Sequence, residues 1–309
     1  MILVFGSINV DLVSKVDRFP MAGETVRGDH FSVLPGGKGG NQALAAARAG
    51  GRVSMFGAVG RDAFADLALA NLADAGVDLR GVSHVEAPTG CATILVERGG
   101  ENRIVIVAGA NSDASAGAPV QDALVSGATL VLQQEVPTAA NLGLAQRARA
   151  ARVRVVLNAA PARALSREFI QLIDVLVVNE SEAASLAGDF GWPTSTWSDF
   201  AKAARHALAP TRDAVVVVTL GAEGALCCGS QSTLRAIAPR VDAIDTTGAG
   251  DAFVGTLAAA LDAGATLDDA LRRAVAAGSL ACTRFGAQAA MPDAVAIAAL
   301  SPSITLRPL

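Results

Sequence analysis

The chain has 309 residues, of which 51% are hydrophobic and 17% are charged. This apolar content suffices for an extensive core and argues against a disordered chain. The formal net charge of −4, without a run of basic residues, argues against nucleic acid as a partner. No apolar stretch reaches the roughly 18 residues of a spanning helix, and the N-terminal residues lack a signal-peptide pattern, so we expect a cytoplasmic protein without a membrane partner.

Short aliphatic runs alternate along the chain with alanine-rich stretches of helical periodicity. Strands are expected at Ile2–Phe5, Val53–Gly57, Thr129–Gln133, Val153–Leu157, Val175–Val178 and Ala214–Leu220. Helices are expected at about residues 40–49, 63–75, 139–151, 181–186, 199–208, 250–262 and 267–283. Aliphatic strands separated by helices are typical of a mostly parallel sheet that is covered on both faces. The sequence therefore predicts an α/β fold, with residues 1–309 as a single domain.

Two segments interrupt this pattern, at about residues 13–33 and 89–107. Both alternate apolar and polar residues, carry turn signals and have no helix between their strands. In the second segment, Gly90–Glu97 and Asn102–Val107 flank Arg98-Gly-Gly-Glu101, which suits a hairpin loop. We expect a small antiparallel sheet at one edge of the large domain, serving as a lid or a dimer contact.

The strongest motif is Asp245-Thr-Thr-Gly-Ala-Gly-Asp251, directly before a predicted helix. Its glycines allow backbone amides to face a concave anion site, where the free N–H groups and the helix dipole favour negative charge. Gly248, Ala249 and Gly250 are therefore predicted to cradle a phosphate. Asp251 either caps the helix or acts as the base for a hydroxyl that attacks this phosphate.

A second motif, Pro35-Gly-Gly-Lys-Gly-Gly-Asn-Gln42, precedes another predicted helix. Four glycines around Lys38 indicate that the backbone approaches something closely, although a flexible surface turn is the alternative. Lys38 is one of three lysines in a chain that otherwise uses arginine, which favours a role for a compact ammonium group. The residue order does not match a Walker A loop.

Further polar residues follow predicted strands, where α/β proteins bind ligands. Asn9 and Asp11 follow the first strand and suit vicinal hydroxyls, although a turn that needs such residues is the alternative. Asn179 and Glu182 have the spacing of a hydrated Mg²⁺ site and equally that of a capping box. The glycines of Thr219-Leu-Gly-Ala-Glu-Gly224 permit a nucleotide to lie against the backbone.

The four cysteines are Cys91, Cys227, Cys228 and Cys282. They show no C-x-x-C spacing, and an adjacent pair cannot easily close a relaxed disulfide. We expect buried, reduced thiols.

Taken together, these motifs resemble the PfkB family of carbohydrate kinases. The resemblance extends over nearly the whole chain, through Gly6-Ser-Ile-Asn9, Gly23-Glu-Thr-Val26, Gly36-Gly-Lys-Gly-Gly-Asn-Gln42, Gly109-Ala-Asn111, Asn158-Ala-Ala-Pro-Ala162, Asn179-Glu-Ser-Glu182, Thr219-Leu-Gly221, Asp245-Thr-Thr-Gly-Ala-Gly-Asp251 and Thr283-Arg-Phe-Gly-Ala-Gln288. It implies a three-layer α/β/α domain with a small β lid. The Gly-Ala-Gly-Asp motif is shared by the whole family, whereas the lysine loop, Asn9 with Asp11, and Glu135 are closest to the members that phosphorylate D-ribose.

The resemblance also implies roles for individual residues. The sugar site would comprise Asn9, Asp11, Gly37, Lys38, Asn41, Glu135 and Asp251. Asp251 would deprotonate the 5-hydroxyl of the sugar. ATP, with Mg²⁺, would lie along Asn179, Thr219, Gly221, Gly224 and Gly250. Its γ-phosphate would lie over the amides of residues 248–251, and Glu182 would serve the Mg²⁺.

The resemblance further implies K⁺ as an activating cation that does not touch the substrate. Its ligands would be the Asp245 side chain with backbone carbonyls of Thr247, Ala281, Arg284 and Gly286. Ala290 stands where a serine is often found in the cation loop, whereas Thr247-Gly248 is the commoner family version. The lid would pair two subunits in a homodimer.

Three alternatives remain open at this point. A PfkB kinase for deoxyribose, fructose or a nucleoside shares these motifs, because one hydroxyl more or less depends on pocket contacts. A dinucleotide-binding oxidoreductase is disfavoured because no Gly-x-Gly-x-x-Gly follows the first strand. A catalytically silent sugar-binding regulator is disfavoured because it would not need Asp251.

Overall fold

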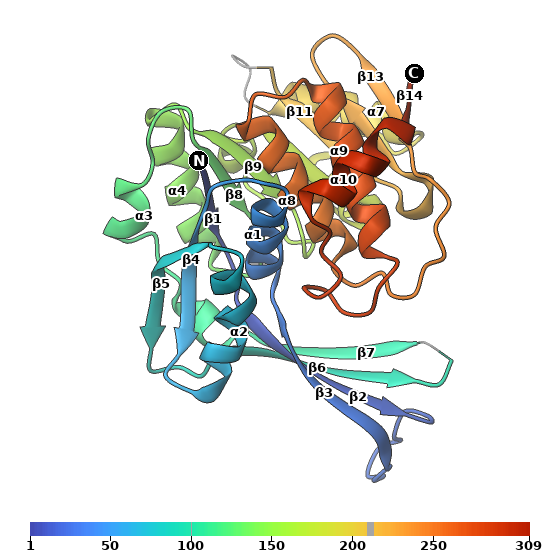
Figure 1. The fold of residues 1–309 in the computed structure, drawn as a ribbon. Coiled ribbons are helices and arrows are strands. Elements are labelled where there is room, and N and C mark those ends of the chain that lie inside the picture. Colours follow the sequence, from blue (N-terminus) through green and yellow to red (C-terminus); the bar gives the residue numbers. More distant parts are fainter. Residues whose placement is uncertain (100, 209–212) are drawn as a thin grey trace.

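The computed structural model describes residues 1–99, 101–208 and 213–309. Among them, ten strands form the large sheet of Figure 1, in the order β14-β13-β12-β11-β10-β9-β8-β1-β4-β5. Its strands are β1 (Ile2–Phe5), β4 (Val53–Gly60), β5 (Asp78–Val85), β8 (Thr129–Leu132), β9 (Arg154–Asn158), β10 (Val175–Asn179), β11 (Val215–Thr219), β12 (Ala225–Cys228), β13 (Thr233–Ile237) and β14 (Thr305–Pro308). The strands β11, β10, β9, β8, β1, β4 and β5 run parallel to one another. The strands β12, β13 and β14 each pair antiparallel with the strand before them in the chain.

Both faces of this sheet are covered by helices, as the aliphatic strands predict. In β11, Val215 and Val217 belong to one buried cluster while Val216 and Val218 belong to the other, because successive side chains point to opposite faces. On one face lie α1 (Lys38–Arg48), α2 (Ala63–Asp74), α8 (Ala249–Asp262), α9 (Leu267–Ala281) and α10 (Ala294–Leu300). On the other lie α3 (Ala118–Asp122), α4 (Thr138–Ala150), α5 (Arg167–Ile170), α6 (Glu180–Phe190) and α7 (Trp197–Ala207). Short 3-10 helices occur at η1 (Gly109–Asp113), η2 (Gly221–Glu223) and η3 (Ser301–Ser303).

The lid is a second sheet that projects from the main body in Figure 1. It contains β2 (Asn9–Val16), β3 (Gly28–Gly36), β6 (Gly90–Glu97) and β7 (Asn102–Val107), in the order β3-β2-β6-β7. The antiparallel expectation holds for the two hairpins, but the central pair β2 and β6 is parallel. The reason is that both strands leave the main body in the same direction. Gly100, in the predicted hairpin loop, lies outside the described residues.

Several elements were not predicted. They include β5, β12, β13, β14, α3, α5 and α10, and the lid also begins earlier than expected, at Asn9. The described cysteines are free, with Cys227 and Cys228 buried as predicted, whereas Cys91 and Cys282 are only half-buried. Burial raises the pKa of Cys227 to about 12, which keeps this thiol protonated. Within the described ranges, no helix combines the length and apolar character needed to span a membrane.

Candidate active site

Polar residues from distant parts of the chain meet at one edge of the large sheet. Because β1, β8, β10 and β11 run parallel, the residues that follow them lie at the same edge. Asn179 and Thr219 are direct register partners at the ends of β10 and β11. Glu135, after β8, reaches the loop between β1 and β2. This edge is where the sequence places the ligand-binding residues.

The lysine loop packs tightly onto the end of β1. A Cβ on Gly39 would lie 2.6 Å from the carbonyl carbon of Gly6, and one on Gly37, which has a φ of 86°, would lie 2.8 Å from the amide nitrogen of Asn9. The amide of Gly40 also donates to the carbonyl of Ser7 at 2.9 Å. The flexible-turn alternative is therefore wrong, because the glycines are needed for this close approach.

Glu135 fixes this loop through one carboxylate oxygen. Its Oε2 accepts the hydroxyl of Ser7 at 2.5 Å and the backbone amide of Lys38 at 3.1 Å. The Ser7 hydroxyl in turn accepts the amide of Gly39 at 3.3 Å. Ser7 was missed as a site residue, and its only signal in the sequence is its place in the Gly6-Ser-Ile-Asn9 motif.

Asn9 and Asp11 lie in strand β2, so neither serves the turn that was the alternative for them. Asn111, which is buried in η1, holds the backbone at Ile8 from both sides, accepting its N–H at 2.8 Å and donating to its carbonyl at 3.2 Å. The Nδ2 of Asn111 also donates to Oδ1 of Asn9 at 2.7 Å. With its oxygen engaged, the Asn9 side chain offers its N–H₂ group as a donor. Asn111 was not predicted as a site residue.

Asp251 is 6% exposed and does not cap its helix. The N-cap of α8 is Gly248, and no side chain accepts from the helix start. Instead, Oδ2 of Asp251 accepts from Nδ2 of Asn41, and Oδ1 accepts from Nε2 of Gln42, both at 2.9 Å. The capping interpretation is therefore wrong, because the carboxylate turns from its own helix to α1.

The carboxyl groups of Asp11, Glu135, Glu182 and Asp251 interact with one another, and three of them act on the half-buried ammonium group of Lys38. Burial lowers the pKa of Lys38, but the charges of Asp251, Glu135 and Glu182 outweigh this and raise it, so Lys38 stays protonated. Burial, with the charges of Glu135 and Asp251, raises the pKa of Asp11 to about 6.

Burial also raises the pKa of Asp251, opposed by the charge of Lys38 and by hydrogen bonds from Asn41 and Gln42. A carboxylate with a raised pKa is a stronger base than a solvated one, provided that it remains ionised. Lys38 and the two amide donors all favour the ionised form.

The start of α8 forms an open cradle beside Asp251. Gly248 has a φ of 77°, and a Cβ there would lie 3.0 Å from Cα of Ala287, so the backbone itself requires glycine. A Cβ on Gly250 would meet nothing within 4 Å. Packing therefore does not explain Gly250, and its missing side chain leaves space over the free N–H groups of the helix start. Such a space suits a phosphate.

Asn179 and Glu182 form the capping box that was the alternative to a metal site. The amide of Glu182 donates to Oδ1 of Asn179, and Oε2 of Glu182 accepts the amide of Asn179, both at 2.8 Å. Burial raises the pKa of Glu182. Within the part of the chain that the structure describes, no three His, Cys, Asp or Glu side chains are grouped to hold a metal. Mg²⁺ fits this donor set as an ion held mainly by nucleotide phosphates and water.

The loop after β11 is a tight turn. Gly221 has a φ of 53° and open space at its Cβ position, whereas a Cβ on Gly224 would overlap the carbonyl oxygen of Ala236. The conformation of the turn therefore accounts for Gly224, while Gly221 leaves room beside Thr219.

Asp245 joins the two loops of the predicted cation site. Its Oδ1 accepts the amide of Thr247 at 2.9 Å, and its Oδ2 accepts the amide of Gly286 at 2.9 Å. These bonds and the Thr247 hydroxyl outweigh burial and lower the pKa of Asp245. Ala281 is the last residue of α9, and Arg284 follows in the loop that leads to Gly286. The ionised carboxylate of Asp245 could supply one anionic ligand to a monovalent cation, and its hydrogen bonds tie residue 247 to residue 286.

Comparisons with known proteins agree with this geometry. Residues 1–294 match the family model described as pfkB family carbohydrate kinase. The chain belongs to the PfkB family of carbohydrate kinases. A protein named ribokinase from Lactococcus lactis is 37% identical over 292 residues, which cover 94% of this chain and 93% of that protein.

Two solved structures resemble this PfkB kinase closely. The ribokinase from Thermotoga maritima superposes with a TM-score of 0.89 at 33% identity, covering 97% of this chain and 98% of that one. The Arabidopsis thaliana ribokinase, solved with ribose and ATP, gives a TM-score of 0.88 at 31% identity with the same coverage. The overall fold of this chain is thus shared with these two ribokinases.

The contrast between Gly248 and Gly250 gives a paired prediction. We expect Gly250→Val to fold normally and to lose about 10²-fold in kcat, because the new side chain occupies the space over the helix start. Gly248→Ala should instead destabilise the fold by about 1–3 kcal/mol, because its φ is positive. Thermal unfolding and initial rates measure both effects. Wild-type turnover in Gly250→Val would show that no reacting group uses this space.

Proposed function

We propose that this PfkB kinase transfers the γ-phosphoryl group of ATP to the 5-hydroxyl of D-ribose, giving ribose 5-phosphate in the cytoplasm. The observation that carries the proposal is the buried carboxylate of Asp251, held by α1 beside the open helix start at Gly250. The ribokinases that cover nearly the whole chain support ribose as the acceptor.

The sugar would bind between the lysine loop and the first lid strand. Asn9 offers an N–H₂ donor, while Asp11 and Glu135 offer carboxylate oxygens to sugar hydroxyls. Oδ1 of Asn41 is buried without a hydrogen-bond partner, so it is a ready acceptor for another hydroxyl. Gly37 and Lys38 complete the wall beneath the sugar. Alternating donors and acceptors of this kind suit a small polyol.

Asp251 would accept the proton of the attacking hydroxyl. The N–H groups of residues 248–251 would stabilise the charge on the transferred phosphoryl group, and Lys38 would add positive charge from the sugar side. The nucleotide would extend from Gly250 towards Asn179, Thr219, Gly221 and Gly224. When bound with ATP, Mg²⁺ would neutralise phosphate charge, and the carboxylate of Glu182 would orient its water ligands.

A substrate panel tests the proposal. ADP release should be fastest with D-ribose when ribose, deoxyribose, fructose, other pentoses and hexoses, and nucleosides are compared at equal concentration. Ribose 5-phosphate should be the product by NMR. A clear preference for deoxyribose, fructose or a nucleoside would refute ribose as the substrate while leaving the kinase assignment intact.

Replacing the base tests the role of Asp251. Asp251→Asn should lower kcat by about 10²–10⁴, because the amide cannot accept the proton, while the Kd for ATP changes little. Asp293→Asn provides a matched control, since the Asp293 side chain is exposed and caps α10, so its replacement should leave kcat unchanged. Turnover near wild type in Asp251→Asn would exclude this residue as the base.

We also propose that K⁺ activates the enzyme through Asp245. Rates should be several-fold higher in potassium than in sodium buffers, since an ion that bridges residues 245–247 and 281–286 would fix the amides of the cradle. Asp245→Asn should lose this preference. Equal rates in the two buffers would count against the cation site.

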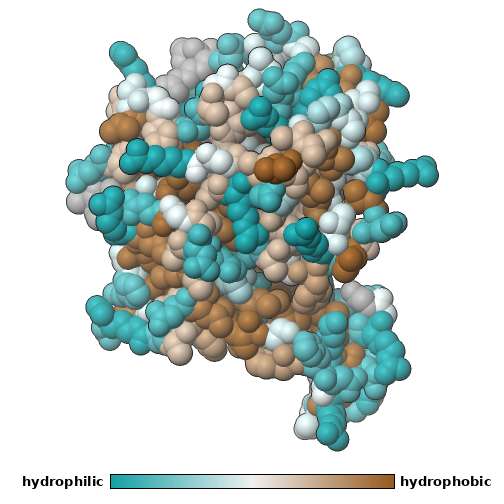
Figure 2. All heavy atoms as spheres, viewed as in Figure 1, coloured by the Kyte–Doolittle hydropathy of each residue, from teal (hydrophilic) through white to brown (hydrophobic). Residues whose placement is uncertain are grey.

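The lid is proposed to pair two subunits in a homodimer. β7 is an edge strand, and Ile104, Val105, Ile106 and Val107 on it are 50–64% exposed. Four consecutive exposed aliphatic residues on an unpaired strand are typical of a surface that another chain covers. In Figure 2, further hydrophobic surface lies along the lower edge of the main body beside the root of the lid.

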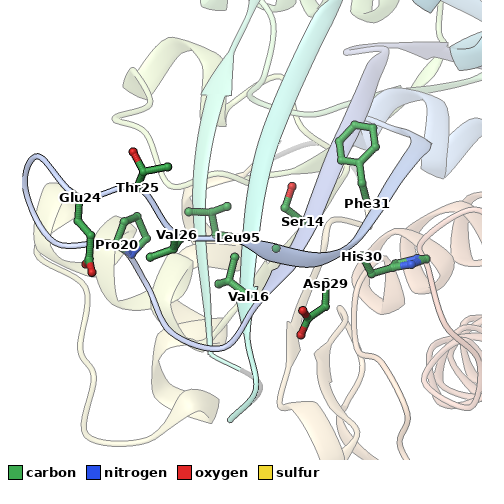
Figure 3. A pocket seen from close by; sticks show the side chains of 11 residues that line it. Ser14, Val16, Pro20, Glu24, Thr25, Val26, Asp29, His30, Phe31 and Leu95 are labelled. Atoms are coloured by element: carbon green, nitrogen blue, oxygen red, sulfur yellow. The ribbon is translucent and has the colours of Figure 1, made fainter.

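Figure 3 shows the side chains that line a hollow on the lid, from β2, β3, their connecting loop and Leu95 of β6. The volume of this hollow is about 610 Å³. None of the residues predicted to bind sugar or nucleotide lines it. This surface therefore belongs to the lid itself and is compatible with a contact between subunits.

Sedimentation velocity tests the lid contact. The wild-type chain should be a dimer, and replacing Ile104 and Ile106 together by lysine should give monomers, because charges on the edge strand oppose pairing. Val295→Lys is the control, since Val295 is 78% exposed on α10, far from the lid in Figure 1. A wild-type monomer at micromolar concentration would refute the contact.

A further inference from the structure

Gln42 is a buried residue of α1 that the assigned roles leave unused. Its side chain is fully buried, and its Nε2 lies 2.9 Å from both Oδ1 of Asp251 and Oδ1 of Asn158. The Gln42 side chain therefore connects Asp251, in α8, to Asn158, the last residue of β9. Asn41, beside it, contacts the other carboxylate oxygen of Asp251 but keeps a free oxygen that can meet a ligand.

The charge on Asp251 fixes the direction of this amide. An ionised carboxylate can only accept hydrogen bonds, so Gln42 must turn its N–H₂ group towards it. Its Oε1 then faces Gln133, whose Nε2 donates to it at 2.9 Å. A chain of amides with a defined direction thus runs from β8 to the base.

The far end of the chain is anchored in the sheet. Gln133 follows β8, and its carbonyl accepts from Asn141 of α4 at 2.6 Å. Asn158 donates to the carbonyl of Val177 in β10 at 3.3 Å. A Cβ on Gly6 would overlap the side-chain oxygen of Gln133, so Gly6 leaves the space that this side chain occupies. Gln133, Asn158 and Asp251, which are distant from one another in the sequence, all contact the side-chain amide of Gln42.

Every other neighbour of Asp251 that influences its charge can itself ionise or contact a ligand. Lys38 and Glu135 act on it directly, and Asp11 and Glu182 lie close enough to respond to its charge. Gln42 and Asn158 cannot ionise, and both side chains are buried. Gln42 also cannot take the proton from Asp251, because a neutral amide is not a base.

We infer that Gln42 is a positioning residue that holds the carboxylate of Asp251 ionised and oriented through the amide chain from Gln133 and Asn158. The inference rests on the proposed role of Asp251 as the base. It makes Gln42 responsible for the protonation equilibrium of the base as well as for its orientation, whereas a packing role would affect only the fold.

The test is the pH dependence of kcat/KM for the sugar that is turned over fastest, measured from pH 5 to 9 with saturating MgATP. Loss of the hydrogen bond from Gln42, which favours the charged form, raises the pKa of the base, so the acidic limb should move to higher pH. In Gln42→Leu we expect a shift of about 1 pH unit and a loss of about 10-fold or more below the limb, with the deficit narrowing at alkaline pH. Thr129→Val, which replaces a buried hydroxyl without a hydrogen-bond partner on β8, should keep the wild-type profile.

Gln42→Glu keeps the size of the side chain and guards against loss of folding in Gln42→Leu. The introduced carboxylate would repel the charge on Asp251, so the limb should move at least as far in the same direction. Thermal unfolding establishes that each variant is folded. A limb that stays in place in the folded variants, with activity lowered equally at every pH, would overturn the inference. A limb that persists in Asp251→Asn would instead refute the base assignment beneath it.

Discussion

The active site depends on the burial of one carboxylate. A charge such as that of Asp251 is costly to remove from water unless donors and opposite charge replace the solvent. Here α1 supplies both, through Lys38 at its first turn and the amides of Asn41 and Gln42. The two helices can approach because Gly255 of α8 lies against α1: a Cβ there would be 2.5 Å from the carbonyl oxygen of Gln42. The small residues of α1 and α8 thus allow the close contact that brings Gln42 and Asn41 to Asp251.

The position of α1 in turn depends on the loop that precedes it. α1 begins at Lys38, two residues before the predicted start, because the glycine loop packs directly on the end of β1. This early start places Lys38 in the first turn, above the sheet edge and beside Glu135. The same glycines that suggested a ligand-binding loop are therefore needed first for contact with the protein's own backbone. The proposed ligand site is a consequence of that packing.

The sequence predicted the parallel part of the sheet because strands such as β1 and β11 are aliphatic on both faces, which only a covered sheet explains. It missed β12, β13 and β14, which pair antiparallel with their neighbours and so fall outside the alternation of strands and helices. It also predicted the lid but not the parallel pairing of β2 with β6, since alternation of apolar and polar residues carries no information on strand direction. Ser7, Gln42 and Asn111 were missed as site residues because their roles exist only through partners distant in the sequence.

The different roles of Asp251 and Asn179 cannot be predicted from their neighbours in the sequence alone. Each is a polar residue at the start of a helix, and each allowed a cap or a chemical role. Asn179 caps α6, because its partner for the capping box lies three residues away. Asp251 turns away from α8, because α1, about 210 residues earlier in the chain, offers two amide donors and a half-buried ammonium group. A carboxylate in the first helical turn is therefore free to act as a base only where the fold provides stronger partners than its own helix.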